Sequence, residues 1–225
     1  MLYKGSFDKI NMHVHTKYTF GSSLSLKDVE VFLKKNPDFG LAITDINTIE
    51  GALTLKGKYP EKIIVGSQII TQQGAITGLF LKEPIPGGRG LNWTIDAILV
   101  QDGLVMVPHP YDRLRKTSLS DADLNLALKR CDLVEVFNSR TIHADDNKKA
   151  LHLIGEDILP VCGSDAYTKS ELKRTYVKLS SNPALTSVDF YEALIQTDLI
   201  CRKAPVSALL FTKAYTTYKK IIKSR

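Results

Sequence analysis

The stretch Ile10-Asn11-Met12-His13-Val14-His15 decides the fold, because it reads as the first strand of the chain and carries two histidines at its end. Side chains two positions apart on a strand point to the same side. We therefore expect His13 and His15 to project together, with Met12 and Val14 turned the other way into packing. Two adjacent imidazoles at a strand end can serve as metal ligands. A pair of hydrogen-bonded histidines without metal is the simpler alternative for so short a motif.

Length and composition predict one globular domain over residues 1–225. The hydrophobic share of 44% and the charged share of 24% are ordinary for such a domain. Apolar runs stay well below the roughly 18 residues of a membrane span, and the start of the chain has no apolar signal core. We therefore expect a cytoplasmic protein without membrane association. Three widely spaced cysteines, Cys131, Cys162 and Cys201, are expected to be small buried thiols rather than a disulfide framework.

A formal net charge of +6 hints at anionic partners. Much of this charge lies near the C-terminus, where two tyrosines are interleaved with it. The basic residues there are Lys213, Lys219, Lys220, Lys223 and Arg225. A basic, aromatic helix can lie along a phosphate backbone. The solvated outer face of a terminal helix explains the same residues more simply.

Strand-like and helix-like runs alternate along the chain. We expect strands over 10–15, 41–44, 62–66, 75–81, 104–107, 133–137, 158–162, 176–179 and 199–202. Helices are expected over 26–35, from 48, over 92–101, 120–131, 144–154 and 187–197, and from 206. Such alternation predicts a parallel sheet with right-handed crossovers. About seven or eight of these strands in 225 residues suit a closed barrel better than an open sheet.

Polar side chains follow these strands at the points where the strands end. They are His13, His15, Asp45, His109, Asn138 and Asp165. The carboxyl ends of the strands in a β/α barrel share one mouth, where active sites form. The sequence therefore predicts that these distant residues become neighbours.

At this point the chain resembles the polymerase-and-histidinol-phosphatase (PHP) superfamily over nearly its whole length. The resemblance rests on six motifs in the family's order: Met12-His13-Val14-His15-Thr16, Ala42-Ile43-Thr44-Asp45, Gly66 through Leu81, Pro108-His109-Pro110-Tyr111-Asp112-Arg113, Glu135-Val136-Phe137-Asn138-Ser139-Arg140, and Gly163-Ser164-Asp165-Ala166. It implies a distorted seven-stranded (β/α)7 TIM-like barrel. It also implies a phosphoesterase centre of up to three divalent ions (Zn, Mn or Fe), as in the smaller members that hydrolyse nucleotides and short oligonucleotides.

The chain departs from the family's pattern at four positions. Phe20, Ile46 and Tyr167 stand where the family has ligands that together hold one metal, so one subsite is predicted to be lost and filled by these side chains. Gln68 replaces the family's bridging Glu. Two dications about 3.5 Å apart repel by roughly 19 kcal/mol at an effective dielectric of about 20, and a neutral amide cannot offset this repulsion.

We therefore expect one ion, and at most two. His13, His15 and Asp165 are the expected ligands, with Gln68 nearby, because two imidazoles and a carboxylate leave a position open for water. His109 and Asn138 resemble the second subsite and are weaker candidates. Gln68 and Asn138 are alternatively polar lining of the site.

Arginines that follow the ligand motifs are candidates for binding substrate phosphate. Arg113 and Arg140 are the main ones, because a guanidinium grips phosphate through two hydrogen bonds. Surface ion pairs are the alternative for both, and Arg115 is a weaker candidate. Asp45 is expected to orient a neighbouring group rather than bind metal.

Two functions fit these residues. The first is a metal-dependent phosphoesterase that cleaves phosphate mono- or diesters of nucleotides or oligonucleotides. The second is a non-catalytic relative that binds a nucleotide, RNA or a protein partner at the barrel mouth. A serine hydrolase of the Gly-x-Ser-x-Gly type and a P-loop nucleotidase are disfavoured, because neither motif is present.

Overall fold

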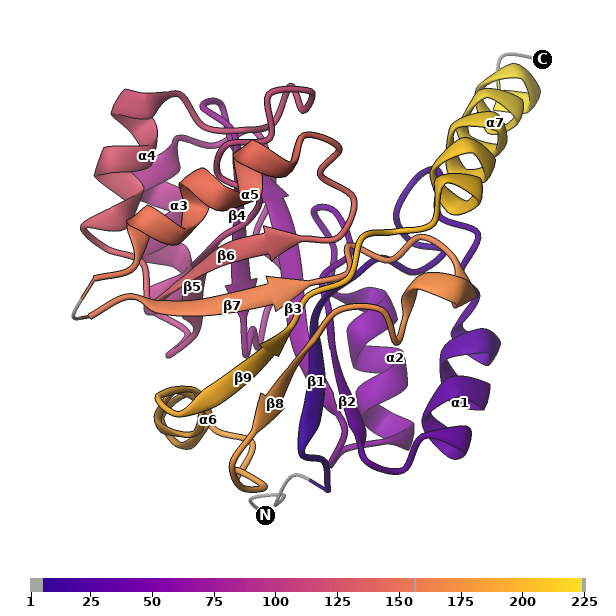
Figure 1. Cartoon of the computed structure of the whole chain (residues 1–225), viewed down its shortest axis with the longest axis horizontal. Helices are drawn as coiled ribbons and strands as arrows, with labels where there is room; N and C mark the ends of the chain where they lie inside the picture. The colour runs from indigo at the N-terminus through magenta and orange to yellow at the C-terminus, as the bar shows by residue number, and fades with distance from the viewer. Residues whose placement is uncertain (1–5, 156, 224–225) are drawn as a thin grey trace.

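The computed structural model describes residues 6–155 and 157–223, in which nine strands form one sheet, accompanied by seven α-helices (Figure 1). The strands are β1 (Lys9–Val14), β2 (Phe39–Ile43), β3 (Ile63–Ile70), β4 (Ala75–Leu79), β5 (Leu104–Val107), β6 (Leu133–Asn138), β7 (Leu159–Gly163), β8 (Tyr176–Leu179) and β9 (Thr197–Ile200). The helices are α1 (Leu26–Lys35), α2 (Glu50–Lys58), α3 (Leu91–Leu99), α4 (Asp121–Leu128), α5 (Ala144–Ala150), α6 (Ser187–Leu194) and α7 (Val206–Lys223). The predicted order of elements is confirmed.

The sheet curls into a nearly closed barrel. Its strand order is β7-β6-β5-β4-β3-β2-β1-β8-β9. The barrel closes where the end of β1 meets the segment after β7, through a parallel bridge between Val14 and Ala166. There the amide of His15 donates to the carbonyl of Ala166 over 2.9 Å, and the amide of Ala166 donates to the carbonyl of His13 over 3.2 Å. The predicted distorted barrel is confirmed.

The expectation of an all-parallel sheet was wrong at β4. This strand runs antiparallel to both β3 and β5. Only residues 71–74 connect β3 to β4, whereas a parallel connection needs a crossover of about a dozen residues or more. Strand β8 also pairs antiparallel, with β1 and with β9.

Three helices begin at polar side chains that cap their free backbone amides. Ser25 accepts from the amide of Asp28 at the start of α1, and the Asp28 carboxylate reaches back to the amide of Ser25. Ser120 and Thr186 cap α4 and α6 in the same way with their hydroxyl oxygens. Such caps stabilise a helix start by about 1 kcal/mol each.

Apolar side chains form one cluster inside the barrel and another between strands and helices. The inner cluster takes residues from every strand of the barrel, and Phe190 of α6 belongs to it. The outer cluster joins the strands to apolar faces of α1–α5. Met12 packs in the inner cluster and Val14 in the outer one, because β1 is irregular between Asn11 and Val14. The simple alternation expected for β1 therefore breaks just where the histidines lie.

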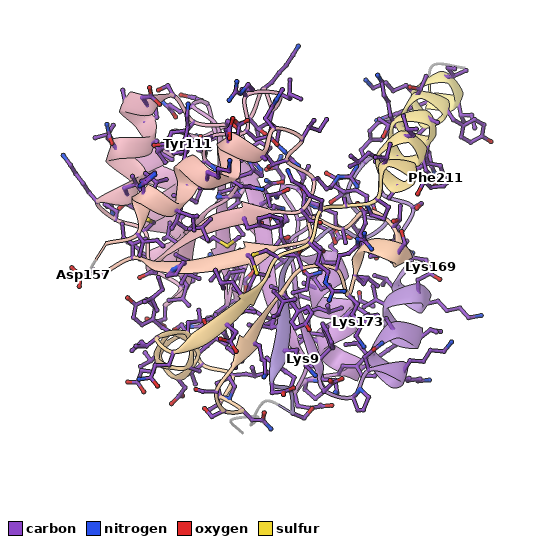
Figure 2. All side chains as sticks on the ribbon, in the orientation of Figure 1. Lys9, Tyr111, Asp157, Lys169, Lys173 and Phe211 are labelled. Carbon is purple, nitrogen blue, oxygen red and sulfur yellow. The ribbon has the colours of Figure 1, made fainter. Side chains whose placement is uncertain are left out.

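Two of the three cysteines are buried, as expected. Cys131 and Cys162 are buried, whereas Cys201 is exposed because it follows the end of the outermost strand, β9. Among the described residues, no helix has the length and apolar character that crossing a membrane requires. The last helix, α7, stands away from the barrel, and its side chains radiate into the space around it (Figures 1 and 2). Arg225, part of the basic C-terminal stretch, lies outside the described residues.

Candidate metal centre

Three side chains, two from the end of β1 and one from the segment after β7, meet at the mouth of the barrel. Nε2 of His13 and Nε2 of His15 are 3.0 Å apart. Oδ1 of Asp165 lies 3.2 Å from Nε2 of His15 and 3.7 Å from Nε2 of His13. All three side chains are fully buried. The structure thus brings together the residues that the sequence singled out as the main metal ligands.

Hydrogen bonds on the far side of each ring set the orientation of both imidazoles. Oε1 of Glu135 lies 3.0 Å from Nδ1 of His13. The hydroxyl of Thr19 donates to Asp45 over 2.7 Å and lies 3.1 Å from Nδ1 of His15. Because both partners accept hydrogen bonds, each Nδ1 carries the proton. The two Nε2 lone pairs therefore point at each other and at Asp165.

Asp45 organises the loop after β1 and does not reach the cluster. Its buried carboxylate accepts from the amide and the hydroxyl of Thr16, each over 2.6 Å, as well as from Thr19. Burial raises the pKa of Asp45, although these hydrogen bonds oppose the effect. This is the orienting role that the sequence suggested for Asp45.

Asp165 has one oxygen paired and one unpaired. Its Oδ2 accepts a hydrogen bond from Arg115, whose Nε lies 3.1 Å from Asp112. Its buried Oδ1 has no hydrogen-bond partner among the described residues. Burial raises the pKa of Asp165, but the charges of Arg115 and of the two histidines outweigh it, so the pKa lies well below its usual value. An ionised oxygen therefore faces the two imidazoles.

This donor set fits a cation. Two imidazole lone pairs and an unpartnered carboxylate oxygen lie within 4.8 Å of one another. Two histidines and one carboxylate are a ligand set of catalytic zinc sites. Without an ion, a proton must separate the two lone pairs. Burial lowers the pKa of His13, but Glu135 and Asp165 more than compensate and raise it, so this ring takes that proton.

His109, Gln68 and Asn138 line the centre beside the three ligands. Nε2 of His109 lies 2.9 Å from the side-chain nitrogen of Gln68, and its ring lies 6.0 Å from that of His13. Burial holds the pKa of His109 well below its usual value, so this imidazole is neutral. The amide of Asn138 donates to Glu135 over 3.0 Å and to Asp165 over 3.3 Å. This donation matches the polar lining expected for Asn138.

Two residues of the centre have strained backbones. His109 and Asp165 both adopt left-handed backbone conformations, with φ of 32° and 51°. Such conformations cost a residue other than glycine about 1–3 kcal/mol and cluster at functional sites. Packing around the mouth therefore holds these two residues in place at a cost in stability.

The two arginines expected to bind phosphate are both engaged in ion pairs. Arg113 is half exposed and forms a two-pronged pair with Asp146, with Nη2 to Oδ1 at 2.5 Å. Arg140 pairs with buried Glu171 and lies over the ring of Tyr167 at 4.8 Å. Phosphate binding by these arginines stays a prediction and requires them to leave or share these carboxylates.

Of the three side chains expected to fill the vacated subsite, Tyr167 lies closest to the cluster, with its ring 4.7 Å from that of His15. Ile46 is half-buried, and its amide donates to Thr19 over 3.0 Å. Phe20 is 51% exposed, so the expectation that it packs in the subsite was wrong. The turn after β1 directs Thr19 inward, and its neighbour Phe20 consequently faces solvent.

The sequence did not identify Glu135 as part of the site, and it ranked Arg115 too low. Glu135 contacts His13 and also accepts a hydrogen bond from the amide of His109 over 2.8 Å. Its signal was a single charged residue within the apolar run of β6. Arg115, rated below Arg113 and Arg140, is the arginine that touches a candidate ligand.

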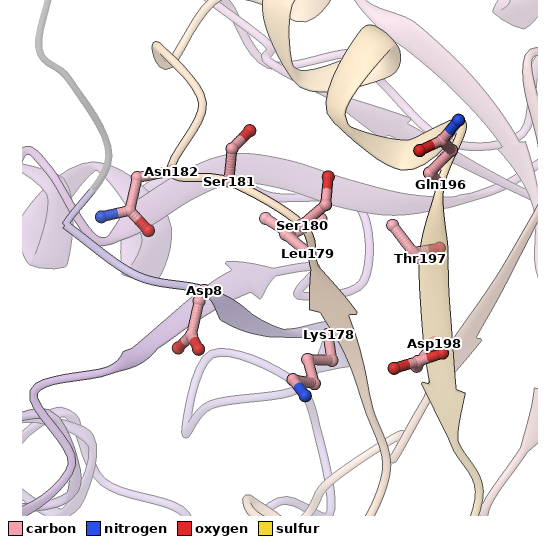
Figure 3. Close-up of a pocket in the computed structure, with 9 residues that line it drawn as sticks. All are labelled: Asp8, Lys178, Leu179, Ser180, Ser181, Asn182, Gln196, Thr197 and Asp198. Atoms are coloured by element: carbon pink, nitrogen blue, oxygen red, sulfur yellow. The ribbon is translucent and has the colours of Figure 1, made fainter.

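The cluster is covered, and the open cavities lie elsewhere. Arg115 pairs with Asp165 of the cluster, and its side chain is 23% exposed. A cavity of about 610 Å³ opens instead beside β8 and β9, lined by Asp8, Lys178 and Asp198 among others (Figure 3). Its lining contains no imidazole or thiol. Chemistry therefore points to the buried cluster rather than to this cavity.

No protein-family model matches the chain. An uncharacterised protein of Methanocaldococcus jannaschii, MJ1587, is 38% identical to it over 144 residues, which are 58% of this chain and 82% of that protein. Among solved structures, a two-domain Bacteroides vulgatus protein containing a predicted PHP-like metal-dependent phosphoesterase superposes with a TM-score of 0.65. It is 13% identical, and the match covers 95% of this chain and 73% of that one.

The lesion-specific endonuclease EndoQ of Pyrococcus furiosus superposes with a TM-score of 0.51 at 14% identity, over 85% of this chain and 57% of that one. Identities this low establish the fold and leave the chemistry to the residues themselves. The chain therefore belongs to the same family as the M. jannaschii protein, and its fold is that of the PHP superfamily.

Proposed function

We propose that this protein is a metal-dependent phosphoesterase with a reduced centre that holds one divalent ion. The observation that carries the proposal is the unpartnered, ionised oxygen of Asp165 facing the Nε2 atoms of His13 and His15. Zn, Mn and Fe are the candidate ions, since imidazole and carboxylate suit all three. When bound, such an ion lowers the pKa of a water molecule and supplies the nucleophile.

The surrounding residues hold the ligands in the required state. Glu135 keeps the proton of His13 on Nδ1, and Thr19 does the same for His15. The neutral ring of His109 and the Gln68 amide contact each other beside the three ligands. The lack of a bridging carboxylate at Gln68 is the reason for proposing one ion rather than two.

Arg115 is the residue that we assign to substrate phosphate. Two carboxylates, Asp112 and Asp165, hold its guanidinium at the cluster, and its partial exposure leaves room for an incoming anion. A guanidinium in this position offsets charge that develops on phosphoryl oxygens. Phosphate mono- or diesters of nucleotides or short oligonucleotides are the proposed substrates.

The test is metal analysis of the protein purified without chelator, together with a screen of phosphomonoesters and phosphodiesters in the presence of Zn, Mn and Fe. We expect about one ion per chain and hydrolysis that His15→Ala abolishes together with metal binding. His143→Ala is the matched control, because this histidine precedes α5, its side chain makes no capping hydrogen bond there, and it is not part of the cluster. An absence of metal and of hydrolysis would contradict the proposal.

A non-catalytic protein is the second candidate, and the burial of the whole cluster favours it. In that case nucleotide or oligonucleotide binding survives both chelation and His15→Ala. A combined variant, Ile46→His with Gln68→Glu and Tyr167→His, separates the two further. If the lost ligands limit activity, this variant binds more metal and turns over faster.

A further inference from the structure

Helix α7 presents an apolar half to solvent. Its large apolar side chains Leu210, Phe211, Tyr218 and Ile222 are 63%, 51%, 57% and 51% exposed. Because successive residues of a helix are about 100° apart, these four share one half of the circumference. Figure 2 shows Phe211 on this helix, toward the end that joins the barrel, where it lines a surface pocket with Thr168 and Lys169.

The opposite half of α7 attaches the helix to the barrel. Its buried residues are Ala208 and Thr212, and Thr216 follows one turn later. Thr216 lies against Gly21, which has a φ of 89° and no room for a side chain on that side. An amphipathic helix of a globular protein ordinarily turns its apolar face to the core. In α7 the apolar face points to solvent instead, and the opposite face contacts the barrel.

The charges of α7 have one sign. Lys213, Lys219, Lys220 and Lys223 are all exposed, and residues 206–225 contain no acidic residue. At about 100° per residue, all four lysines fall on the half that does not carry the exposed apolar side chains. A helix with one apolar half and lysines on the other half matches an interface between water and an anionic apolar phase.

We propose that α7 binds the surface of an anionic lipid bilayer and lies in the interface with its apolar half inserted. Phe211 and Tyr218 supply aromatic anchors, and the four lysines attract lipid head groups. The apolar face covers about half of the helix circumference, which suits the flat surface of a bilayer. Packing against one other helix would need only a narrower apolar stripe. This proposal departs from the sequence-based expectation of a protein without membrane association, and it stands apart from the proposed phosphoesterase activity.

Two other occupants are less compatible with the charges and the shape of α7. A second copy of the helix would bring lysines close to lysines, with no carboxylate on either helix to pair with them. A nucleic acid would neutralise the lysines but leave Leu210, Phe211 and Ile222 in water. Both occupants are outcomes of the experiment below.

The experiment is flotation of the full chain with vesicles of phosphatidylcholine alone and of phosphatidylcholine with roughly a third phosphatidylglycerol. We expect binding to the anionic vesicles only, weakened by salt. The double variant Leu210→Gln with Phe211→Gln keeps a good helix former at both positions and should lower vesicle partitioning by about tenfold or more. Val188→Gln on α6, equally apolar and 67% exposed, is the matched control and should bind normally.

Three results would overturn the proposal. One is failure of the wild-type chain to bind anionic vesicles. Another is a vesicle-free dimer in light scattering that the double variant dissociates, because this result assigns the apolar half to a second copy. The third is oligonucleotide binding that depends on the four lysines, combined with vesicle binding that the double variant leaves unchanged. Hydrolysis of a small soluble phosphodiester should be equal in wild type and variant, so a failure of this proposal is distinguishable from a failure of the proposed activity.

Discussion

Oε1 of Glu135 lies 3.0 Å from Nδ1 of His13, although the two residues are 122 positions apart in the chain. The contact crosses from β6 to β1 inside the barrel mouth. It leaves Nε2 of His13 free for an ion and strengthens this nitrogen as a ligand. If the proposed ion binds, this carboxylate would set its affinity through His13 without touching substrate.

Replacing this carboxylate should weaken metal binding. We expect Glu135→Ala to lower the affinity for Zn or Mn by about 10–100-fold, because His13 loses the partner that orients it. Glu135→Gln should lose less, because its amide oxygen can still accept from Nδ1. Calorimetric titration against a competing chelator measures the affinity, and exposed Glu192→Ala on α6 is the control. Unchanged affinity in a folded Glu135→Ala protein would show that the contact has no such role.

The close approach of β7 to this pair depends on Gly163. A methyl group there would collide with both Oε1 of Glu135 and Cβ of His13. Gly163→Ala should therefore destabilise the fold by about 1–3 kcal/mol and weaken metal binding without changing any titratable group. Gly57→Ala in α2 meets no neighbour and should stabilise the protein by about 0.5–1 kcal/mol. Urea unfolding of both variants provides the comparison, and a Gly163→Ala protein as stable as wild type would contradict the predicted collision.

The ion pair between Arg115 and Asp165 should contribute far more to the free energy of unfolding than the exposed ion pair between Lys82 and Asp102. Arg115→Gln leaves the buried Asp165 charge uncompensated, so we expect a loss of about 3 kcal/mol in the free energy of unfolding of the metal-free protein. Lys82→Gln removes the partner of Asp102 from an ion pair that is exposed on both sides and should change stability much less. If the two variants lose equal stability, Asp165 is not as isolated as its burial indicates. In turnover assays, Arg115→Lys should lower kcat for a phosphate ester more than it raises KM, because the proposed role of the guanidinium is to offset charge that develops during the reaction.

His109 should make the metal-free protein sensitive to acid. Its pKa lies well below the usual 6.5 in the folded chain, so below pH 6.5 the unfolded chain binds a proton that the folded chain does not. Stability therefore falls as the pH drops from 6.5, by at most about 1.4 kcal/mol per pH unit from this group. The raised pKa of His13 acts with the opposite sign, and its contribution is lost as the pH rises above 6.5. Urea titrations from about pH 5 to pH 7 should show a shallower slope for His109→Asn, and an identical slope would contradict this assignment.

Much of this architecture was predictable because polar residues break the alternating pattern at strand ends. His13, His15 and Asp165 could be placed at one mouth from their positions alone. The reversal of β4 was also readable, since residues 71–74 are too few for a crossover. The partners of the arginines were not predictable, because Arg113 lies in a loop, and no periodicity of the sequence encodes how that loop approaches Asp146 of α5. The outward turn of Phe20 depends in the same way on the local hydrogen bonds of Thr19.

The barrel closes through the backbone of the two histidines, since His13 and His15 exchange hydrogen bonds with Ala166 where β1 meets the segment after β7. An ion held by their side chains and by Asp165 would hold β1 and the segment after β7 together where the barrel closes. Chelation should then speed amide hydrogen exchange in β1 and β7 while leaving β4 protected. Metal supply would in this way govern how long each polypeptide survives in the cell, in addition to whether it can react.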